Sequence, residues 1–147
     1  LFYDLSVYTL LPMLQIMGLN YENVDFKVSK DGDDIEFASM NFVYSNGRAV
    51  INVGNTIRVN NQFEIIGTKG TIRMNGDWWR SKRFELHTPG FSEVQFFNTN
   101  FDGNGFKYLI REMSRMLSDN RIDSKSIFEE ESLKIVEILE QVKKSGE

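Results

Sequence analysis

The sequence contains no cysteine, only two prolines and a single histidine. The lack of cysteine excludes disulfides, thiolate metal sites and a cysteine nucleophile, and a cytoplasmic location fits it. The longest apolar stretch, residues 7–17, is too short and too interrupted to span a bilayer, so no membrane partner is expected. No segment has the basic, apolar and small-residue pattern of a signal peptide.

A strong positive charge is also missing, because the formal net charge is −4. A mildly acidic chain lacks the basic surface that binds a phosphate backbone, so nucleic acid is not an expected partner. The 147 residues include 41% hydrophobic and 26% charged side chains, which is typical of one globular domain over residues 1–147. The chain begins at Leu1, and its first residues already have helix-like sequence. We therefore expect the chain to be a piece of a longer protein.

The hydrophobic periodicity changes twice along the chain. Residues 4–17 have the 3.6-residue period of a helix, with Pro12 expected to kink it or to mark a boundary. A strand-like region follows, and Asn46-Gly47 is its strongest hairpin signal. The strands are expected at residues 24–29, 35–44, 48–59, 62–67, 71–74, 78–87 and 93–97.

The helical period returns after residue 98, with one apolar face running from Phe106 to Leu117. A last helix is expected to begin with Ser126 as its cap and Glu129 three residues later. No helix interrupts the strands, so the sheet should be mainly antiparallel. The pattern predicts an α+β fold in which helices cover one face of an open sheet of about six strands.

The expected strand 35–44 has apolar side chains on both faces. Ile35, Phe37 and Val43 point one way, and a face with Met40 and Phe42 points the other. Because three helices can cover only one face, a second face lined with methionine and aromatics indicates a partner sheet, another domain or a ligand. A twisted sheet that curls over itself is the alternative.

Asp4 and Tyr8 are the first candidates for chemistry, because a spacing of four places both side chains on one face of a helix. A tyrosine hydroxyl can donate a proton to a developing alkoxide, but its ordinary pKa of about 10 requires a nearby cation. The segment has no lysine or arginine. Spacing alone favours a helix-start aspartate and a half-buried packing tyrosine.

Four other features have structural explanations. His87 has no nucleophile or orienting acid that the sequence reveals, so a structural or simply exposed histidine is favoured. The acidic turn at residues 31–34 lacks calcium-loop spacing, and residues 98–106 lack the bidentate acid, so no metal is expected. Gly103-Asn104-Gly105 does not complete a dinucleotide fingerprint. Trp78 and Trp79 suit a pocket or simple packing equally well.

Taken in order, these segments resemble the C-terminal domain of the Gfo/Idh/MocA oxidoreductases, relatives of glucose-fructose oxidoreductase and inositol dehydrogenase. The resemblance covers essentially all 147 residues. It rests on FEIIGTKGTIRM at 63–74, FDGNGFKYLIREM at 101–113 and the family's Asp-x-Gly-x-(His or Tyr) motif. Asp4 and Tyr8 match that motif, whereas Ser6 replaces its usual glycine. The dimeric dihydrodiol dehydrogenase branch is the most similar part of the family.

The resemblance implies a domain like that of dihydrodipicolinate reductase and glyceraldehyde-3-phosphate dehydrogenase, joined to an N-terminal Rossmann domain that this chain lacks. It implies an acid–base role for Tyr8 and a positioning role for Asp4. Trp78, Trp79 and Phe101 are expected to contact substrate. The implied cofactor is NAD or NADP, held outside this chain, with a Glu-Lys-Pro motif there supplying the cation that Tyr8 needs.

The resemblance therefore predicts hydride transfer with a sugar, polyol or related cyclic alcohol by the intact protein, and no activity from this chain alone. It also predicts a homodimer or tetramer that forms through the open sheet face. Two other interpretations stay open: a dimerisation or scaffold domain without catalysis, and a carbohydrate-binding module.

Overall fold

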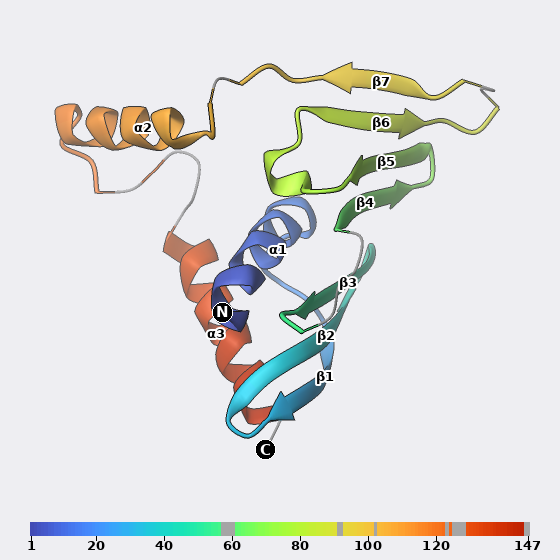
Figure 1. The fold of residues 1–147 in the computed structure, drawn as a ribbon, viewed down its shortest axis with the longest axis vertical. Helices are drawn as coiled ribbons and strands as arrows, with labels where there is room; N and C mark the ends of the chain where they lie inside the picture. Colours follow the sequence, from blue (N-terminus) through green and yellow to red (C-terminus); the bar gives the residue numbers. More distant parts are fainter. Residues whose placement is uncertain (57–60, 91–92, 102, 123, 125–128, 146–147) are drawn as a thin grey trace. The chain divides into compact units, whose positions relative to one another are not determined.

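The computed structural model describes residues 1–56, 61–90, 93–101, 103–122, 124 and 129–145 (Figure 1). The chain divides into two compact units. The first unit comprises Leu1–Arg58 with Asp123–Glu147, and the second unit comprises Val59–Ile122. None of the described helices is long and apolar enough to cross a membrane.

The first unit is a three-stranded antiparallel sheet with two helices, as Figure 1 shows. Its strands are β1 (Asn23–Asp31), β2 (Asp34–Tyr44) and β3 (Gly47–Gly54), in the order β1-β2-β3. Its helices are α1 (Phe2–Met17) and α3 (Glu129–Ser145). Pro12 lies inside α1, where it cannot donate a helical hydrogen bond to the carbonyl of Tyr8.

The hairpin expected at Asn46-Gly47 is confirmed, with a shift of one residue. Tyr44 pairs with Gly47, so that Gly47 is the first residue of β3 and the turn lies before it. The expected end of this strand, from residue 57 onward, lies outside the described residues, as does the expected cap at Ser126.

The core of the first unit lies between the sheet and the two helices. Alternate residues of β2 are fully buried there, because successive side chains of a strand point to opposite faces. The buried apolar residues are Phe2, Leu10, Met13, Leu14, Ile35, Ala38, Met40, Phe42, Tyr44, Ile51, Val53, Ile135, Ile138 and Val142. This layer of helices on one sheet face is the usual solution for burying amphipathic elements.

The expectation that a face with methionine and aromatics needs an outside partner is wrong for this sheet. Met40 and Phe42 lie on the face that α1 and α3 cover. The register places Phe37, Val43 and Val50 on the other face, among residues that are mostly polar. Those polar residues include Asn23, Asp25, Lys27, Ser39, Asn41, Arg48 and Asn52.

The second unit has a four-stranded antiparallel sheet in the order β4-β5-β6-β7. The strands are β4 (Gln62–Gly67), β5 (Gly70–Asn75), β6 (Arg83–His87) and β7 (Gln95–Asn98). A single turn of 3₁₀ helix, η1 (Trp78–Arg80), joins β5 to β6, and α2 (Phe106–Ser118) follows the sheet.

The expected strand 78–87 is wrong over its first residues. Gly76 turns the chain at a φ of 73°, and the Arg80 amide then donates to the Asp77 carbonyl at 3.0 Å. These local hydrogen bonds form η1, so that the strand begins only at Arg83. The two tryptophans therefore lie in a turn and do not alternate across a strand.

The two faces of the second sheet differ in chemistry. The register aligns an apolar set on one face, half-buried except for the exposed Phe97: Phe63, Ile65, Ile72, Met74, Phe84, Leu86 and Phe97. The other face carries charged neighbours, among them an ion pair between Arg73 and Glu64. The apolar stripe of α2 is also exposed, since no residue of this helix is buried and Leu117 is 82% exposed.

The fold class predicted from the sequence is confirmed as α+β with antiparallel strands and helices on one sheet face. The single open sheet of about six strands that the sequence predicts is instead two sheets, which hold three and four of the seven described strands. α1 and α3 pack on one face of the first sheet.

Replacing Gly70 by alanine is expected to lower the free energy of unfolding by about 1–3 kcal/mol. A Cβ at Gly70 would lie 2.7 Å from the carbonyl oxygen of His87, closer than such atoms approach in proteins. Gly67 is the matched control, because its Cβ would meet the Gly70 carbonyl at an ordinary 3.5 Å. Urea denaturation of both variants measures the free energy of unfolding. Equal losses in the two variants would contradict the close contact between a Cβ at residue 70 and the His87 carbonyl.

Candidate functional site

Asp4 and Tyr8 lie on the N-terminal half of α1, on one exposed face of the helix. The side chain of Asp4 is exposed and that of Tyr8 is 56% exposed. Leu1, Tyr3 and Val7 are exposed around them, so the face combines apolar surface with one carboxylate and two phenols. Such a face can hold an apolar ring while a hydroxyl and a carboxylate contact its polar groups.

Ser6, which stands where the resemblance expects glycine, points into the core. It is fully buried, and its hydroxyl donates to the carbonyl of Phe2 at 2.8 Å. Thr9 makes the same kind of bond, from its hydroxyl to the Ser6 carbonyl at 2.8 Å. The Ser6 side chain therefore lies away from the exposed face that carries Asp4 and Tyr8, and it leaves that face unobstructed.

The C-terminal half of α1 is held by polar contacts as well as by its core residues. The hydroxyl of Tyr44 lies 3.0 Å from the carbonyl oxygen of Gly18, to which it donates, and 3.0 Å from the sulfur of Met13. Burial, and secondarily the nearby Tyr21, raise the pKa of Tyr44 above its ordinary value, so this hydroxyl stays protonated as a donor. Gln15 donates to Glu131 of α3 at 3.5 Å. The helix is thus fixed on its packed side.

The other residues expected at the site lie in the second unit. Trp78 and Trp79 contact each other edge to face, with ring centroids 5.9 Å apart. Phe101 is half-buried, and the ammonium of Lys82 lies 5.1 Å from its ring centroid. The structure therefore brings Asp4 together with Tyr8 in one unit, and Trp78 together with Trp79 in the other.

His87 has a partner that sequence reasoning did not identify. Its Nε2 lies 3.2 Å from a carboxylate oxygen of Glu85. The two side chains lie on one face of β6, because residues two apart in a strand point the same way. That spacing was visible in the sequence, and it supplies the acid that the histidine was expected to lack.

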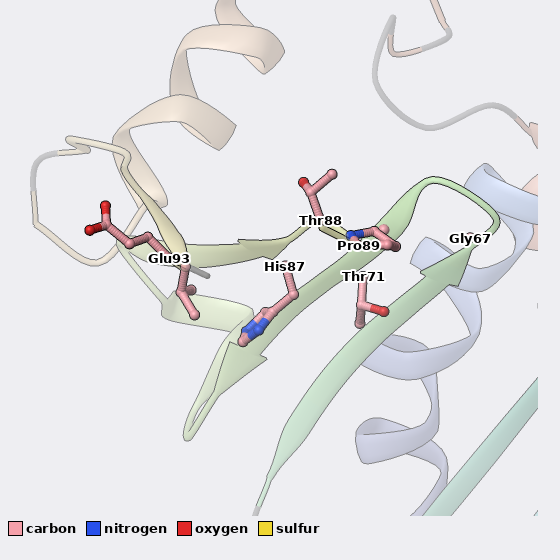
Figure 2. A pocket seen from close by; sticks show the side chains of 8 residues that line it. Gly67, Thr71, His87, Thr88, Pro89 and Glu93 are labelled. Atoms are coloured by element: carbon pink, nitrogen blue, oxygen red, sulfur yellow. The ribbon is translucent and has the colours of Figure 1, made fainter. Parts of the chain in front are cut away.

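A hollow of about 380 Å³ lies beside His87, at the end of the second sheet (Figure 2). It is lined by Gly67, Gly70, Thr71, His87, Thr88, Pro89, Glu93 and Val94. Figure 2 shows that Thr88 points away from His87 and that the Glu93 carboxylate points outward. The side chains of Thr88 and Glu93 therefore do not converge with that of His87 on one point.

Metal binding has no support within the described residues, where no three histidine, aspartate or glutamate side chains gather closely enough to hold an ion. The acidic turn contains Asp31 and Asp34, which pair across the tight hairpin that joins β1 to β2. Asp102, in the second segment weighed for calcium, lies outside the described residues.

Comparison with known proteins gives structural matches only. No protein-family model matches the chain, and no curated protein does. Among solved structures, the chain is similar to KijD10, a 3-ketoreductase from Actinomadura kijaniata, in a complex with NADP and TDP-benzene. The TM-score is 0.74 at 17% identity, over 96% of this chain and 44% of that chain.

A second similar structure is the aldose-aldose oxidoreductase from Caulobacter crescentus, complexed with glycerol. The TM-score is 0.73 at 16% identity, over 96% of this chain and 44% of that chain. The chain thus spans less than half the length of these two oxidoreductases and has the fold of the part that it covers.

Proposed function

We propose that this chain is the substrate-binding domain of an NAD(P)-dependent oxidoreductase of the Gfo/Idh/MocA type. The observation that carries the proposal is the exposed α1 face, on which Asp4 and Tyr8 lie one turn apart on a helix fixed by its core. The shared fold with two oxidoreductases supports it. The motif described from the sequence selects the same two residues.

The cofactor of this proposal is NAD or NADP, bound by an N-terminal Rossmann domain outside this chain. β7 leads into α2 through Gly103 and Gly105, but these glycines do not complete G-x-G-x-x-G and every described strand pair is antiparallel. The described residues therefore offer no βαβ dinucleotide cradle. When bound, the nicotinamide supplies hydride exchange with the substrate carbon that bears the hydroxyl. The mostly apolar surroundings of Asp4 and Tyr8 fit a face that a second domain closes.

In this proposal the Tyr8 hydroxyl exchanges a proton with the substrate oxygen, and Asp4 positions the substrate or its catalytic partner. The Tyr8 side chain is 56% exposed, so an incoming ligand can reach this residue, as it must reach a general acid. The substrate class is a sugar, a polyol or a related cyclic alcohol. This class agrees with the names of the two similar proteins, a 3-ketoreductase and an aldose-aldose oxidoreductase.

We further propose that the chain forms a homodimer or tetramer through a sheet face. The apolar set on the second sheet, with the exposed Phe97 on its edge strand, supports this part of the proposal. An apolar sheet face of this kind is the usual surface for a second copy.

The isolated chain is expected to show no turnover of any polyol with NAD or NADP. The reason is that proton transfer by Tyr8 needs a hydride donor or acceptor placed beside the substrate. The measurement is dinucleotide absorbance during incubation with inositol, glucose or sorbitol. Any sustained turnover would contradict the proposal that a separate domain binds the dinucleotide.

A second test is to read the gene sequence upstream of Leu1. About 120–150 residues encoded before Leu1, the size of one further domain, are expected to contain strand–G-x-G-x-x-G–helix and a Glu-Lys-Pro motif. Joined to this chain, that domain should give polyol-dependent reduction of NAD or NADP. If the upstream region contains neither motif, the scaffold interpretation is favoured instead.

A further inference from the structure

The turn between β5 and β6, residues 76–80, presents an exposed indole on a fixed base. We call it the aromatic turn. Trp78 is half-buried and packs against Phe63, with ring centroids 5.0 Å apart and the ring planes tilted by 31°. Trp79 is 45% exposed and rests edge to face on Trp78. The Trp79 ring is therefore both supported from below and accessible from solvent.

Three polar side chains surround the same turn. Asp77 forms an ion pair with Arg80, and the Asn61 amide donates to the other oxygen of the Asp77 carboxylate at 3.4 Å. A carboxylate offers about four acceptor sites, so it can accept further bonds from ligand hydroxyls. The Arg80 guanidinium and the Asn61 amide, both exposed, can donate to hydroxyl oxygens.

The backbone of the aromatic turn fixes these groups in place. The Trp78 amide donates to the Gly76 carbonyl at 2.7 Å, and the Ser81 amide donates to the Trp78 carbonyl at 3.1 Å. The Ser81 hydroxyl in turn accepts from the Arg83 amide at 3.2 Å. A ligand would thus meet a largely preorganised surface, which lowers the entropy cost of binding.

The chemistry of this surface selects a class of ligand. An indole face favours an apolar ring surface, while carboxylate, guanidinium and amide together favour a ring with several hydroxyls. Asp77 and Arg80 neutralise each other, so the surface does not favour a phosphate or a carboxylate ligand. A pyranose satisfies all of these requirements, because it has a C–H face and a rim of hydroxyls and is uncharged.

We propose that the aromatic turn is a saccharide-binding subsite. The C–H face of a pyranose lies on Trp79, and its hydroxyls donate to Asp77 and accept from Arg80. This inference deepens the proposed function and rests on it for the class of substrate. Binding itself needs neither the dinucleotide nor Tyr8, so the site can be tested on the chain alone.

The test is a titration of the chain labelled with 5-fluorotryptophan. The chain has two tryptophans, so two fluorine resonances report separately on Trp78 and Trp79. Methyl β-D-glucopyranoside is expected to shift the Trp79 resonance in a saturable way, with a dissociation constant of about 1 mM, typical of a shallow site. Asp77→Asn is expected to weaken binding about tenfold through loss of charge-assisted hydrogen bonds, and Arg80→Gln by a similar factor.

Phe96→Ala is the matched control, because Phe96 is another exposed aromatic of the second unit with an arginine, Arg83, 3.8 Å from its ring centroid. It should leave the affinity unchanged. The absence of a saturable shift at about 100 mM sugar, a hundredfold above the expected constant, would overturn the proposal. An equal shift with cyclohexanol, which lacks the rim of hydroxyls, would overturn it too. Because no dinucleotide is present, neither result bears on Asp4 and Tyr8.

Discussion

Replacing Tyr8 by phenylalanine is expected to lower kcat by about 10²–10⁴-fold in the protein that joins this chain to its cofactor domain. The phenyl ring keeps the exposed surface of α1 but removes the only proton that this side chain can exchange. KM should change little, because the apolar contact with the substrate stays. Steady-state rates with a polyol and NAD or NADP measure the effect.

Tyr3→Phe is the control for this experiment. Tyr3 is a second exposed tyrosine on the same half of α1, and no role is proposed for its hydroxyl. Its replacement should leave kcat and KM unchanged. An undiminished kcat for the Tyr8 variant would remove the proposed acid–base group, and the scaffold interpretation would then account better for the chain.

Sequence periodicity predicts most of the elements because local pattern and global fold agree here. The expected strand at 62–67 matches β4 residue for residue, and the expected helix at 4–17 lies within α1. Each segment has a clear hydrophobic period and a glycine that marks its end. Gly18 directly follows the helix, and Gly67 is the last residue of the strand. The fold class follows from the order of such elements.

Two expectations failed because tertiary context decided them. The segment at 78–80 has strand-like composition, but Gly76 and the Asp77–Arg80 pair stabilise a 3₁₀ turn instead. The face of β2 that needs cover cannot be chosen from its own sequence, since apolar residues occur on both sides. Only the packing of α1 and α3 shows that Met40 and Phe42 form the covered face.

The candidate site shows a similar limit. Spacing predicts that Asp4 and Tyr8 share a helix face, but exposure depends on which side of α1 the core takes. The side chain of Ser6 lies on that core side, which the sequence motif does not reveal. The polar groups around Trp79 include Asn61, which is sixteen residues from its partner Asp77 and therefore invisible to a local pattern.

Replacing Phe42 by alanine is expected to lower the free energy of unfolding by about 3–5 kcal/mol. Phe42 is 1% exposed on the central strand of the first sheet, and its ring lies 5.2 Å from that of Tyr21, edge to face. Truncation loses the burial of a large ring, the aromatic contact and the packing around the cavity that remains. A loss of this size is a large fraction of the stability of an ordinary domain.

The matched control is Val50→Ala on the neighbouring strand, because Val50 is 63% exposed on the opposite, mostly polar face. It should change the free energy of unfolding by no more than about 0.5 kcal/mol. Urea denaturation followed by circular dichroism measures both variants. Equal effects would mean that a partner or a second layer covers the polar face as tightly as α1 and α3 cover the other, and the one-sided core would be refuted. A large loss in the free energy of unfolding for the Phe42 variant alone would support a one-sided core. Because α1 packs on the same sheet face as Phe42, this core also holds the helix that carries Asp4 and Tyr8.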